Sequence, residues 1–245
     1  MKTTGNTILI TGATAGIGLA MAQKFLSLGN TVLATGRNIA ALDVLKEQYP
    51  NTLFLYACDL ENRKEVGQLI QQLLEHHPQL NVLINNAGVQ YNYQLLQEAY
   101  LNEKMLQEVE ININAPLQLI GMLLPLLKQQ KQSAIVNISS GLALVPKKSA
   151  AVYCGSKAFI HNFSKALRYQ LESTTIKVFE ILPPLVNTKM TAGRGKDKIE
   201  PAQLVAEFIK SFEGDVYESY IGKTKLLKLL LRISPAIAHK MLKNS

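Results

Sequence analysis

The 245-residue sequence predicts an α/β fold in which helices cover both faces of a doubly wound parallel sheet. Short apolar runs of strand length alternate with longer segments of helical period, and the runs are almost continuously apolar, as in strands buried on both faces. Hydrophobic residues make up 47% of the chain and are spread along it without a long Ser/Gly/Pro-rich linker or an internal repeat. We therefore expect a single domain over residues 1–245.

The first strand is predicted at residues 7–11, where Ile8, Leu9 and Ile10 form an apolar run, and a helix follows from Gly16 to about Leu28. The second strand is predicted at residues 31–35. The same criteria place further strands at residues 52–57, 82–85, 134–138, 177–182 and 216–221, with helices around Leu42, Val66, Leu119, Phe163 and Val205. Such sheets bind ligands beyond the carboxyl ends of their strands, where the strand order reverses. Residues that directly follow the strands are therefore the candidate site residues.

The net charge of +8 does not indicate a nucleic-acid-binding face, because most of the excess lies at one end of the chain. Residues 222–245 contain six Lys or Arg residues and no acidic residue, interleaved with leucines. One interpretation is a basic amphipathic segment that lies on a membrane or on a partner. The other is a terminal helix whose leucines cover the domain while its lysines face water.

The N-terminus and the cysteines favour a cytoplasmic protein. Residues 1–6 lead directly into the first strand, without the hydrophobic segment and cleavage site of a secretory signal. Cys58 and Cys154 are too few for a disulfide framework and suit a reducing compartment. No cysteine and histidine cluster has the spacing of a zinc site, so we expect no metal.

A glycine-rich turn, Thr11-Gly12-Ala13-Thr14-Ala15-Gly16-Ile17-Gly18, links the first strand to its helix. Glycines permit a tight turn and a close approach of the backbone to a pyrophosphate, and the amides of the helix N-terminus favour the anion. Glycines also end strands for purely conformational reasons, but the order of strand, glycines and helix favours a dinucleotide site. The candidate cofactor contacts of this turn are Gly12, Thr14, Gly16, Ile17 and Gly18.

The end of the second strand, Gly36-Arg37, indicates which dinucleotide binds. An NAD-specific site places a carboxylate here for the adenosine ribose, whereas Arg37 can pair with the additional 2′-phosphate of NADP. Arg37 could also be a surface residue at the start of the next helix, although a cation there is slightly unfavourable. The sequence therefore predicts a preference for NADP(H) over NAD(H).

The third and fourth strands end in Cys58-Asp59-Leu60 and Asn85-Asn86-Ala87-Gly88. An Asp after a strand is often only a helix cap, and a loop of this composition is often only a turn. Both loops nevertheless fall where a doubly wound sheet presents groups to an adenosine. The candidate contacts here are Asp59, Leu60, Asn86, Ala87 and Gly88.

Tyr153 and Lys157 stand four positions apart, so that they share one face of a predicted helix. A tyrosine with the usual pKa of about 10 is a poor acid or base near neutral pH, but a nearby cation lowers the pKa of the phenol. We therefore expect Lys157 to lower the pKa of Tyr153. The same spacing also occurs on ordinary solvated helices, so the pair gains its significance from the other motifs.

Together these motifs resemble the short-chain dehydrogenase/reductase family, over residues 7–188. The turn at residues 11–18, the Asn85-Asn86-Ala87-Gly88 loop, Asn112, Ser140 thirteen residues before Tyr153, and the Tyr153/Lys157 pair follow the family order. The resemblance implies a Rossmann sheet of seven parallel strands in the order 3-2-1-4-5-6-7, a nicotinamide cofactor, and hydride transfer between a carbonyl and an alcohol. Two further features, the Pro183-Pro184 pair after the sixth strand and the cationic segment 222–245, resemble a DltE-like bacterial subgroup of this family.

The proposed chemistry assigns a role to each of four residues. Tyr153 is the expected acid in reduction and base in oxidation, and Ser140 is expected to hydrogen-bond the substrate oxygen. Lys157 is also expected to hold the nicotinamide ribose. The resemblance implies that Asn112 distorts its helix and helps to place a water that relays protons to Lys157. Ser139 and Asn114 are the neighbouring alternatives to Ser140 and Asn112.

After the sixth strand the sequence reads Pro183-Pro184-Leu185-Val186-Asn187-Thr188, whereas the family has Pro-Gly at its start. Proline has a fixed φ and no amide donor, so Pro184 puts the backbone path near the nicotinamide in doubt. The resemblance implies cofactor contacts for Pro183, Val186 and Thr188. The glycine-punctuated segment 191–196 is typical of a mobile substrate lid or of a disordered connector.

Three functional hypotheses remain open from the sequence. The first is an NADP-dependent oxidoreductase that acts on a small-molecule carbonyl or alcohol; the second is a nucleotide-sensing scaffold without turnover. The third adds peripheral membrane contact through residues 222–245 and is compatible with catalysis. The substrate pocket is expected from residues 91–100, 142–148 and 189–200. By resemblance, the helices that carry Asn112 and Tyr153 also pair in a homodimer or homotetramer.

Overall fold

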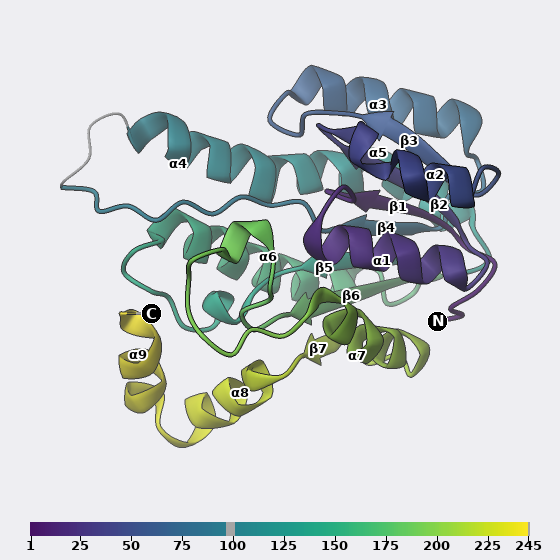
Figure 1. Cartoon of the computed structure of the whole chain (residues 1–245). Coiled ribbons are helices and arrows are strands. Elements are labelled where there is room, and N and C mark those ends of the chain that lie inside the picture. Colours follow the sequence, from purple (N-terminus) through teal and green to yellow (C-terminus); the bar gives the residue numbers. More distant parts are fainter. Residues whose placement is uncertain (97–100, 245) are drawn as a thin grey trace.

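The computed structural model describes residues 1–96 and 101–244 and contains one sheet of seven parallel strands between two layers of helices (Figure 1). The strand order is β3-β2-β1-β4-β5-β6-β7, which confirms the predicted fold class and strand order. The strands are β1 Thr7–Thr11, β2 Thr31–Gly36, β3 Leu53–Ala57, β4 Val82–Asn85, β5 Ser133–Ile138, β6 Ile176–Leu182 and β7 Glu218–Tyr220.

The predicted strand bounds hold to within one residue, except at the last strand. Residues 216–221 were expected there, but only Glu218–Tyr220 pair with β6. Val216 is half exposed, and the chain turns at Asp215, whose φ of 54° is left-handed. The sheet therefore ends in a short edge strand, which limits unpaired backbone groups at this edge.

The helices follow the predicted alternation. The α-helices are α1 Gly16–Ser27, α2 Asp43–Gln48, α3 Arg63–His76, α4 Leu101–Val109, α5 Ala115–Gln129, α6 Ala151–Gln170, α7 Pro201–Glu213, α8 Lys223–Ile233 and α9 Pro235–Lys243. The shorter helical segments are η1 Ile39–Leu42, η2 Glu110–Asn114, η3 Gly141–Ala143 and η4 Lys189–Thr191.

Alternation along β1 creates two separate cores. Ile8 and Ile10 point to one face, where Phe25 of α1 and Phe208 of α7 cover them. Leu9 points to the other face, where residues of α3, α5 and α6 form the second cluster. Because successive side chains of a strand point to opposite faces, a strand covered on both sides must be apolar at every position. This is the physical reason for the continuous apolar runs.

One continuous helical stretch in the described residues, Leu101–Gln129, is long and apolar enough to cross a membrane by length and composition. It comprises α4, η2 and α5. Leu119 and Leu123 on this stretch are completely buried in the second core. Packing against the sheet therefore accounts for its apolar character.

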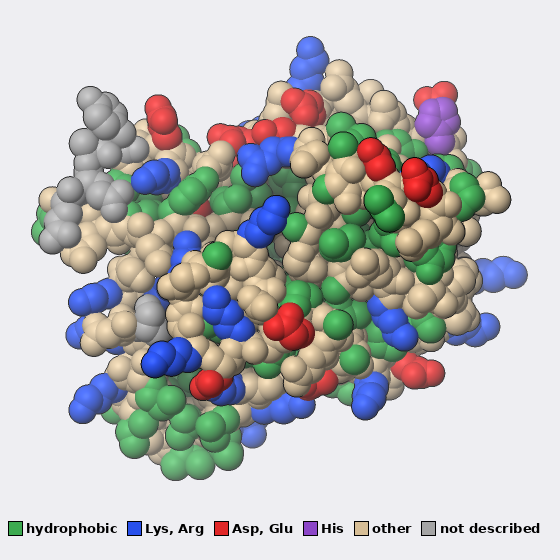
Figure 2. Space-filling model, viewed as in Figure 1, with side chains coloured by type: hydrophobic (Ala, Val, Ile, Leu, Met, Phe, Trp, Pro, Cys, Tyr) green, Lys and Arg blue, Asp and Glu red, His purple; other side chains and the backbone are tan. Residues whose placement is uncertain are grey.

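The last two helices extend from the end of β7 and form a hairpin at one side of the molecule (Figure 1). Leu227 and Ala238 pack with Val145 in a small satellite cluster. Hydrophobic side chains also gather on the outer surface of the hairpin (Figure 2). Leucines of the hairpin were expected to cover the domain, and only those on the side of the hairpin that faces the domain do so.

Candidate active site

A cavity of about 400 Å³ lies at the carboxyl ends of the strands, around the switch point between β1 and β4. The predicted cofactor residues line this cavity, apart from Gly18 and Val186. Gly18 lies behind the glycine turn, and Val186 is buried with its carbonyl accepting a hydrogen bond from the Thr191 hydroxyl. The lining residues among those predicted are Gly12, Thr14, Gly16, Ile17, Arg37, Asp59, Leu60, Asn86, Ala87, Gly88, Tyr153, Lys157, Pro183 and Thr188.

The glycine turn requires its glycines for steric reasons. Gly12 and Gly16 have φ values of 64° and 56°, in the left-handed region that strains other residues. A Cβ atom on Gly12 would lie 2.9 Å from the Ala87 Cα, and a Cβ on Gly18 only 2.2 Å from the Gly12 carbonyl oxygen. The turn thus packs directly against the loop after β4 and against the first turn of α1.

Thr11 and Asn86 hold these two loops together. The Thr11 hydroxyl oxygen accepts hydrogen bonds of 3.0 Å from the backbone amides of Asn86 and Ala87. The Asn86 side-chain amide donates to the Thr11 carbonyl at 2.8 Å and to the Gly12 carbonyl at 3.2 Å. The Asn85–Gly88 loop is therefore both a lining element and a clamp across the switch point.

Gly36 and Arg37, at the end of β2, line the cavity. A Cβ atom on Gly36 would lie 2.9 Å from the Thr14 Cγ2 atom, so that glycine permits the glycine turn to approach β2. Arg37 is exposed at the cavity, and no acidic residue accompanies it at the end of this strand. Asp59, at the end of β3, accepts a hydrogen bond from the Glu61 amide at 3.1 Å, while Asn62 caps α3. Asp59 is therefore not the helix cap.

Tyr153 and Lys157 project from the first turns of α6 at the other end of the cavity. The Lys157 Nζ atom lies 5.7 Å from the centroid of the Tyr153 ring and donates a 2.8 Å hydrogen bond to the Ile138 carbonyl. Ser140 lies two residues after the end of β5, where its hydroxyl accepts a hydrogen bond from the Leu142 amide at 3.1 Å and is close enough to Tyr153 to lower the pKa of the phenol. The structure thus brings together Ser140, Tyr153 and Lys157.

The expected lowering of the Tyr153 pKa by Lys157 is wrong for this structure. Burial raises the pKa of Tyr153 to about 12, and the hydrogen bond from Ser140 and the more distant charge of Arg194 oppose this rise only in part. Burial also lowers the pKa of Lys157 to about 8, against the field of Glu180. Removal of the phenolate from water destabilises it more than the charge of Arg194 stabilises it. The sequence spacing could not reveal this, because burial depends on the surrounding loops.

Asn112 sits within η2, a π-helical turn that interrupts the long helix between α4 and α5. The predicted distortion of the helix at Asn112 is therefore present. Its side-chain amide donates to the Val89 carbonyl and accepts from the Val89 amide, both at 2.9 Å, and also donates to Ser156 at 3.2 Å. Asn114, the alternative, bonds Glu110 instead. Asn112 thus ties the loop after β4 to α6.

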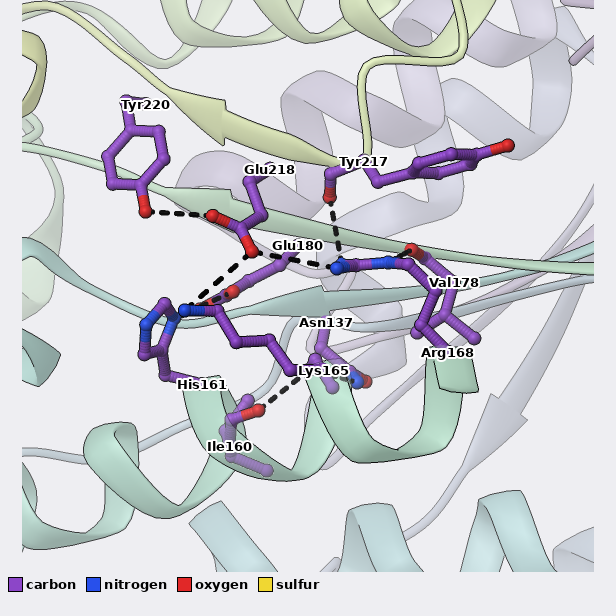
Figure 3. A network of polar contacts seen from close by, with 11 residues as sticks. Asn137, Ile160, His161, Lys165, Arg168, Val178, Glu180, Tyr217, Glu218 and Tyr220 are labelled. Atoms are coloured by element: carbon purple, nitrogen blue, oxygen red, sulfur yellow. Dashed lines mark hydrogen bonds and ion pairs between the residues drawn. The ribbon is translucent and has the colours of Figure 1, made fainter. Parts of the chain in front are cut away.

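A chain of polar side chains crosses from the sheet to α6 beneath the site. The Asn85 amide donates to Asn137 at 2.9 Å, and the Asn137 amide donates to Ser164 of α6 at the same distance. Figure 3 shows the neighbouring network, in which the His161 Nδ1 atom of α6 lies 2.9 Å from both carboxylate oxygens of Glu180 on β6. These buried contacts position the helix that carries Tyr153 and Lys157.

The Pro183-Pro184 variant fits the backbone of this structure. The Pro183 carbonyl accepts a 3.1 Å hydrogen bond from the Gly141 amide, so it is used within the fold. Pro184 lies beside Gly222, where an added Cβ atom would be 3.4 Å from the proline Cγ. Thr188, at the start of η4, lies over the glycine turn, with its Cγ2 atom 3.0 Å from a Cβ on Gly16.

Two charged groups from outside α6, Arg194 and Glu108, act on the Tyr153 phenol, and Lys147 lies near Arg194. The Arg194 Nη2 atom donates a long 3.4 Å hydrogen bond to the Gln90 carbonyl, and its buried Nη1 atom has no partner among the described residues. Lys147 is 9% exposed, and burial and the charge of Arg194 both lower its pKa. Glu108 is completely buried and accepts hydrogen bonds from the Tyr91 amide and the Tyr93 hydroxyl at 2.9 Å.

Several lining residues were not predicted from the sequence. Gly36 and Cys58 are adjacent to predicted residues and could have been found from the strand ends alone. Ser139, whose buried hydroxyl has no partner among the described residues, borders the cavity next to Ser140. Val89, Ile111 and Met190 carry no chemical signal in the sequence. Of the expected substrate segments, residues 97–100 lie outside the described part of the chain. Among the residues that the structure describes, no group of three or more potential metal ligands occurs.

Comparisons with known proteins agree with this architecture. A model of the short chain dehydrogenase family matches residues 6–199. The chain is 41% identical over 201 residues to the uncharacterized oxidoreductase DltE of Bacillus subtilis, covering 81% of this chain and 78% of that protein. It is 30% identical over 179 residues to the NADP-dependent 3-hydroxy acid dehydrogenase YdfG of Escherichia coli O6:H1, covering 73% and 72%. A short chain dehydrogenase from Burkholderia cenocepacia in complex with NADP superposes with a TM-score of 0.88 at 26% identity, covering 100% of both chains.

Proposed function

The chain belongs to the short-chain dehydrogenase/reductase family, and we propose that it is an NADP(H)-dependent oxidoreductase that interconverts a carbonyl and an alcohol. The observation that carries the proposal is the position of Tyr153 and Lys157 at one end of a glycine-lined cavity, with Ser140 next to the lining residue Ser139 and beside Tyr153. Family membership makes the protein an oxidoreductase. The cofactor preference, the residue roles and the substrate are our inferences.

The residues of the cavity fit a dinucleotide. Side chains at Gly12 or Gly18 would collide with the loops that form the cradle, so the glycines keep it open. The bound cofactor supplies the hydride. Gly12, Gly16 and the first turn of α1 would hold the pyrophosphate, and Arg37 would hold a 2′-phosphate. Lys157 and Thr188 would hold the nicotinamide half, and the loop of Asn86, Ala87 and Gly88 would border the adenosine.

Tyr153 is proposed to deliver a proton to the substrate oxygen during reduction. With a pKa of about 12, its phenol retains the proton at neutral pH, which suits an acid better than a base. Ser140 lies within hydrogen-bonding reach of Tyr153 and would hold the same oxygen. Lys157 provides a positive charge beside the phenol, and Asn112 fixes the loop and helix on which these groups depend. We also propose that Asn112 helps to place a water that relays protons to Lys157.

The test is consumption of NADPH with a panel of aldehydes and ketones, comparing the native chain with Tyr153→Phe. Loss of the proton donor is expected to reduce kcat by about a hundredfold or more. NADPH binding, measured by fluorescence titration, should change little because the ring still fills its place. Turnover that survives the substitution would exclude Tyr153 as the acid. Binding of NADPH without turnover by the native chain would favour a catalytically silent, nucleotide-sensing protein.

We further propose that the substrate carries a negatively charged group. Arg194 has a buried Nη1 atom without a partner among the described residues, and Lys147 is buried nearby, so an anion would compensate both cations. Glu108 opposes them, but its burial raises its pKa and its oxygens already accept two hydrogen bonds. The relative YdfG is named for 3-hydroxy acids, which agrees with this class of substrate.

Oxo acids and their neutral esters distinguish the two substrate classes. Arg194→Gln should raise KM for the acids by about tenfold while leaving the esters unaffected, because a charge-assisted hydrogen bond contributes about 1.5–3 kcal/mol. Lys196→Gln, an exposed neighbour, is the control. Equal kcat/KM values for acids and esters in the native enzyme would contradict the anionic substrate.

The proposal also places the enzyme in the cytoplasm as a homo-oligomer. Both cysteines are free and buried, which suits a reducing compartment. Phe159 of α6 is 39% exposed and stacks on Phe163 at 5.8 Å, and Met122 of α5 is 45% exposed. These exposed apolar side chains on α5 and α6 favour a contact between copies. Analytical ultracentrifugation of the native chain and Phe159→Ser tests this assembly.

A further inference from the structure

The hairpin of α8 and α9 carries a row of exposed apolar side chains on its outer surface, which we call the apolar ridge. Their exposed fractions range from 51% to 72%. Figure 2 shows hydrophobic side chains gathered on this part of the surface, with blue Lys and Arg side chains around them. The ridge consists of Leu226, Leu229 and Ile233 of α8 and Ile237 and Met241 of α9.

Packing of the hairpin on the domain does not account for the ridge. A different set of residues faces inward, with Leu227 and Ala238 buried against Val145. Leu226, Leu229 and Ile233 follow an i, i+3, i+7 spacing, which places them on one side of α8, away from Leu227. The helix therefore has two apolar faces, and only one of them has a partner in the described structure.

The cations of the hairpin lie beside the ridge. Lys223 and Lys225 pair with Asp197 and Glu207 at 3.0 and 2.8 Å, but all these groups except Glu207 are strongly exposed, so the pairs are weak. The other cations of the hairpin, Lys228, Arg232, Lys240 and Lys243, form no ion pair within the described residues, although the Lys228 ammonium lies 3.8 Å from the Tyr220 ring centroid. The segment 222–245 contains no acidic residue.

We propose that the apolar ridge and its cations dock the enzyme onto a membrane surface that contains anionic lipids. Apolar side chains of a surface helix enter the boundary between headgroups and acyl chains, and flanking Lys and Arg residues bind anionic headgroups. A second copy of the chain is a poorer partner, because an isologous contact would bring two hairpins of the same positive charge together.

The docking surface is joined to the proposed active site. Thr224 at the start of α8 packs against η3, where its Cγ2 atom would be 2.9 Å from a Cβ on Gly141. The Lys148 amide donates a 3.0 Å hydrogen bond to the Lys243 carbonyl at the end of α9. Both contacts involve the loop that directly follows Ser140. Membrane docking would thus hold this loop near the lipid surface.

The test is co-sedimentation of the full chain with vesicles of phosphatidylcholine, with and without phosphatidylglycerol. Binding is expected only with the anionic lipid and should weaken at high salt. The triple variant Arg232→Gln/Lys240→Gln/Lys243→Gln is expected to bind about a hundredfold more weakly, because each cation near an anionic surface contributes about fivefold. The matched control, Lys2→Gln/Lys64→Gln/Lys131→Gln, changes the net charge equally and should bind like the native chain.

The ridge itself is tested by Leu226→Ser/Ile233→Ser, which should also lose vesicle binding. Val44→Ser/Leu74→Ser removes two exposed apolar side chains elsewhere and serves as its control. All these positions are exposed, so melting temperature and NADPH binding should remain native. Absence of native binding to anionic vesicles would overturn the proposal, as would equal losses in both charge variants. Self-association that Leu226→Ser/Ile233→Ser abolishes would overturn it in favour of a contact between copies.

Discussion

Gly18→Ala is expected to destabilise the protein although it places alanine, the best helix former, within α1. The Cβ atom would lie 2.2 Å from the Gly12 carbonyl oxygen and 2.5 Å from the Asn86 Nδ2 atom. Even close carbon to oxygen contacts keep about 3.3 Å, so the glycine turn must move by about 1 Å. Both neighbours belong to the clamp between β1 and β4 and cannot rotate away as a flexible side chain could.

The two energies have opposite signs. Alanine in place of glycine within a helix contributes about 1 kcal/mol, whereas overpacking of a well-packed site costs about 1–3 kcal/mol or more. We expect a net loss of up to about 2 kcal/mol, which corresponds to a fall in Tm of up to about 8 °C for a domain of this size. A shift of about 1 Å in the cradle should also lower kcat/KM by about a hundredfold.

Thermal melting measures the loss of stability, the steady-state rate of NADPH consumption measures kcat/KM, and a fluorescence titration measures the affinity for NADPH. Gly121→Ala is the matched control, since Gly121 lies in the exposed side of α5 and an added Cβ atom would meet nothing within 4 Å. That variant should be as stable as the native chain or more stable, and should bind NADPH equally. A Gly18→Ala variant that melts at the native temperature and binds NADPH with native affinity would refute the steric reasoning.

Three further predictions concern charged groups. The pKa of about 8 for Lys157 means that its ammonium loses a proton as the pH rises through that value, so kcat/KM for carbonyl reduction should fall above about pH 8. The pH profile of Lys157→Met should lack this fall, and a native profile that stays flat above about pH 8 would contradict the assignment. Arg37→Glu should weaken NADPH binding far more than NADH binding, whereas equal losses in two titrations would remove the basis for NADP preference. Glu180→Ala removes the buried partner of His161 and should lower the free energy of unfolding by about 3 kcal/mol, measured by urea denaturation, while the exposed control Glu172→Ala should change it by less than about 0.5 kcal/mol.

The sequence predicted the features that depend on local periodicity. Continuous apolar runs indicated strands buried on both faces, and the glycine turn of residues 11–18 indicated where the chain must bend closely around β1. The four-residue spacing of Tyr153 and Lys157 placed both on one side of α6, because the helical period is a property of the backbone. These signals were sufficient for the sheet, its strand order by family resemblance, and most of the cavity lining.

Contacts between distant segments decided the rest. Burial by loops far apart in the chain raised the pKa of Tyr153, where the sequence predicted a lowered value from the nearest cation alone. The meeting of Arg194 with the surroundings of Tyr153 depends on how residues 189–199 fold over the site. The leucines of α8 similarly read as one apolar stripe, and only the packed structure separates Leu227 from Leu226 and Leu229. Side-chain spacing follows from the chain itself, but desolvation and exposure depend on what each side chain packs against.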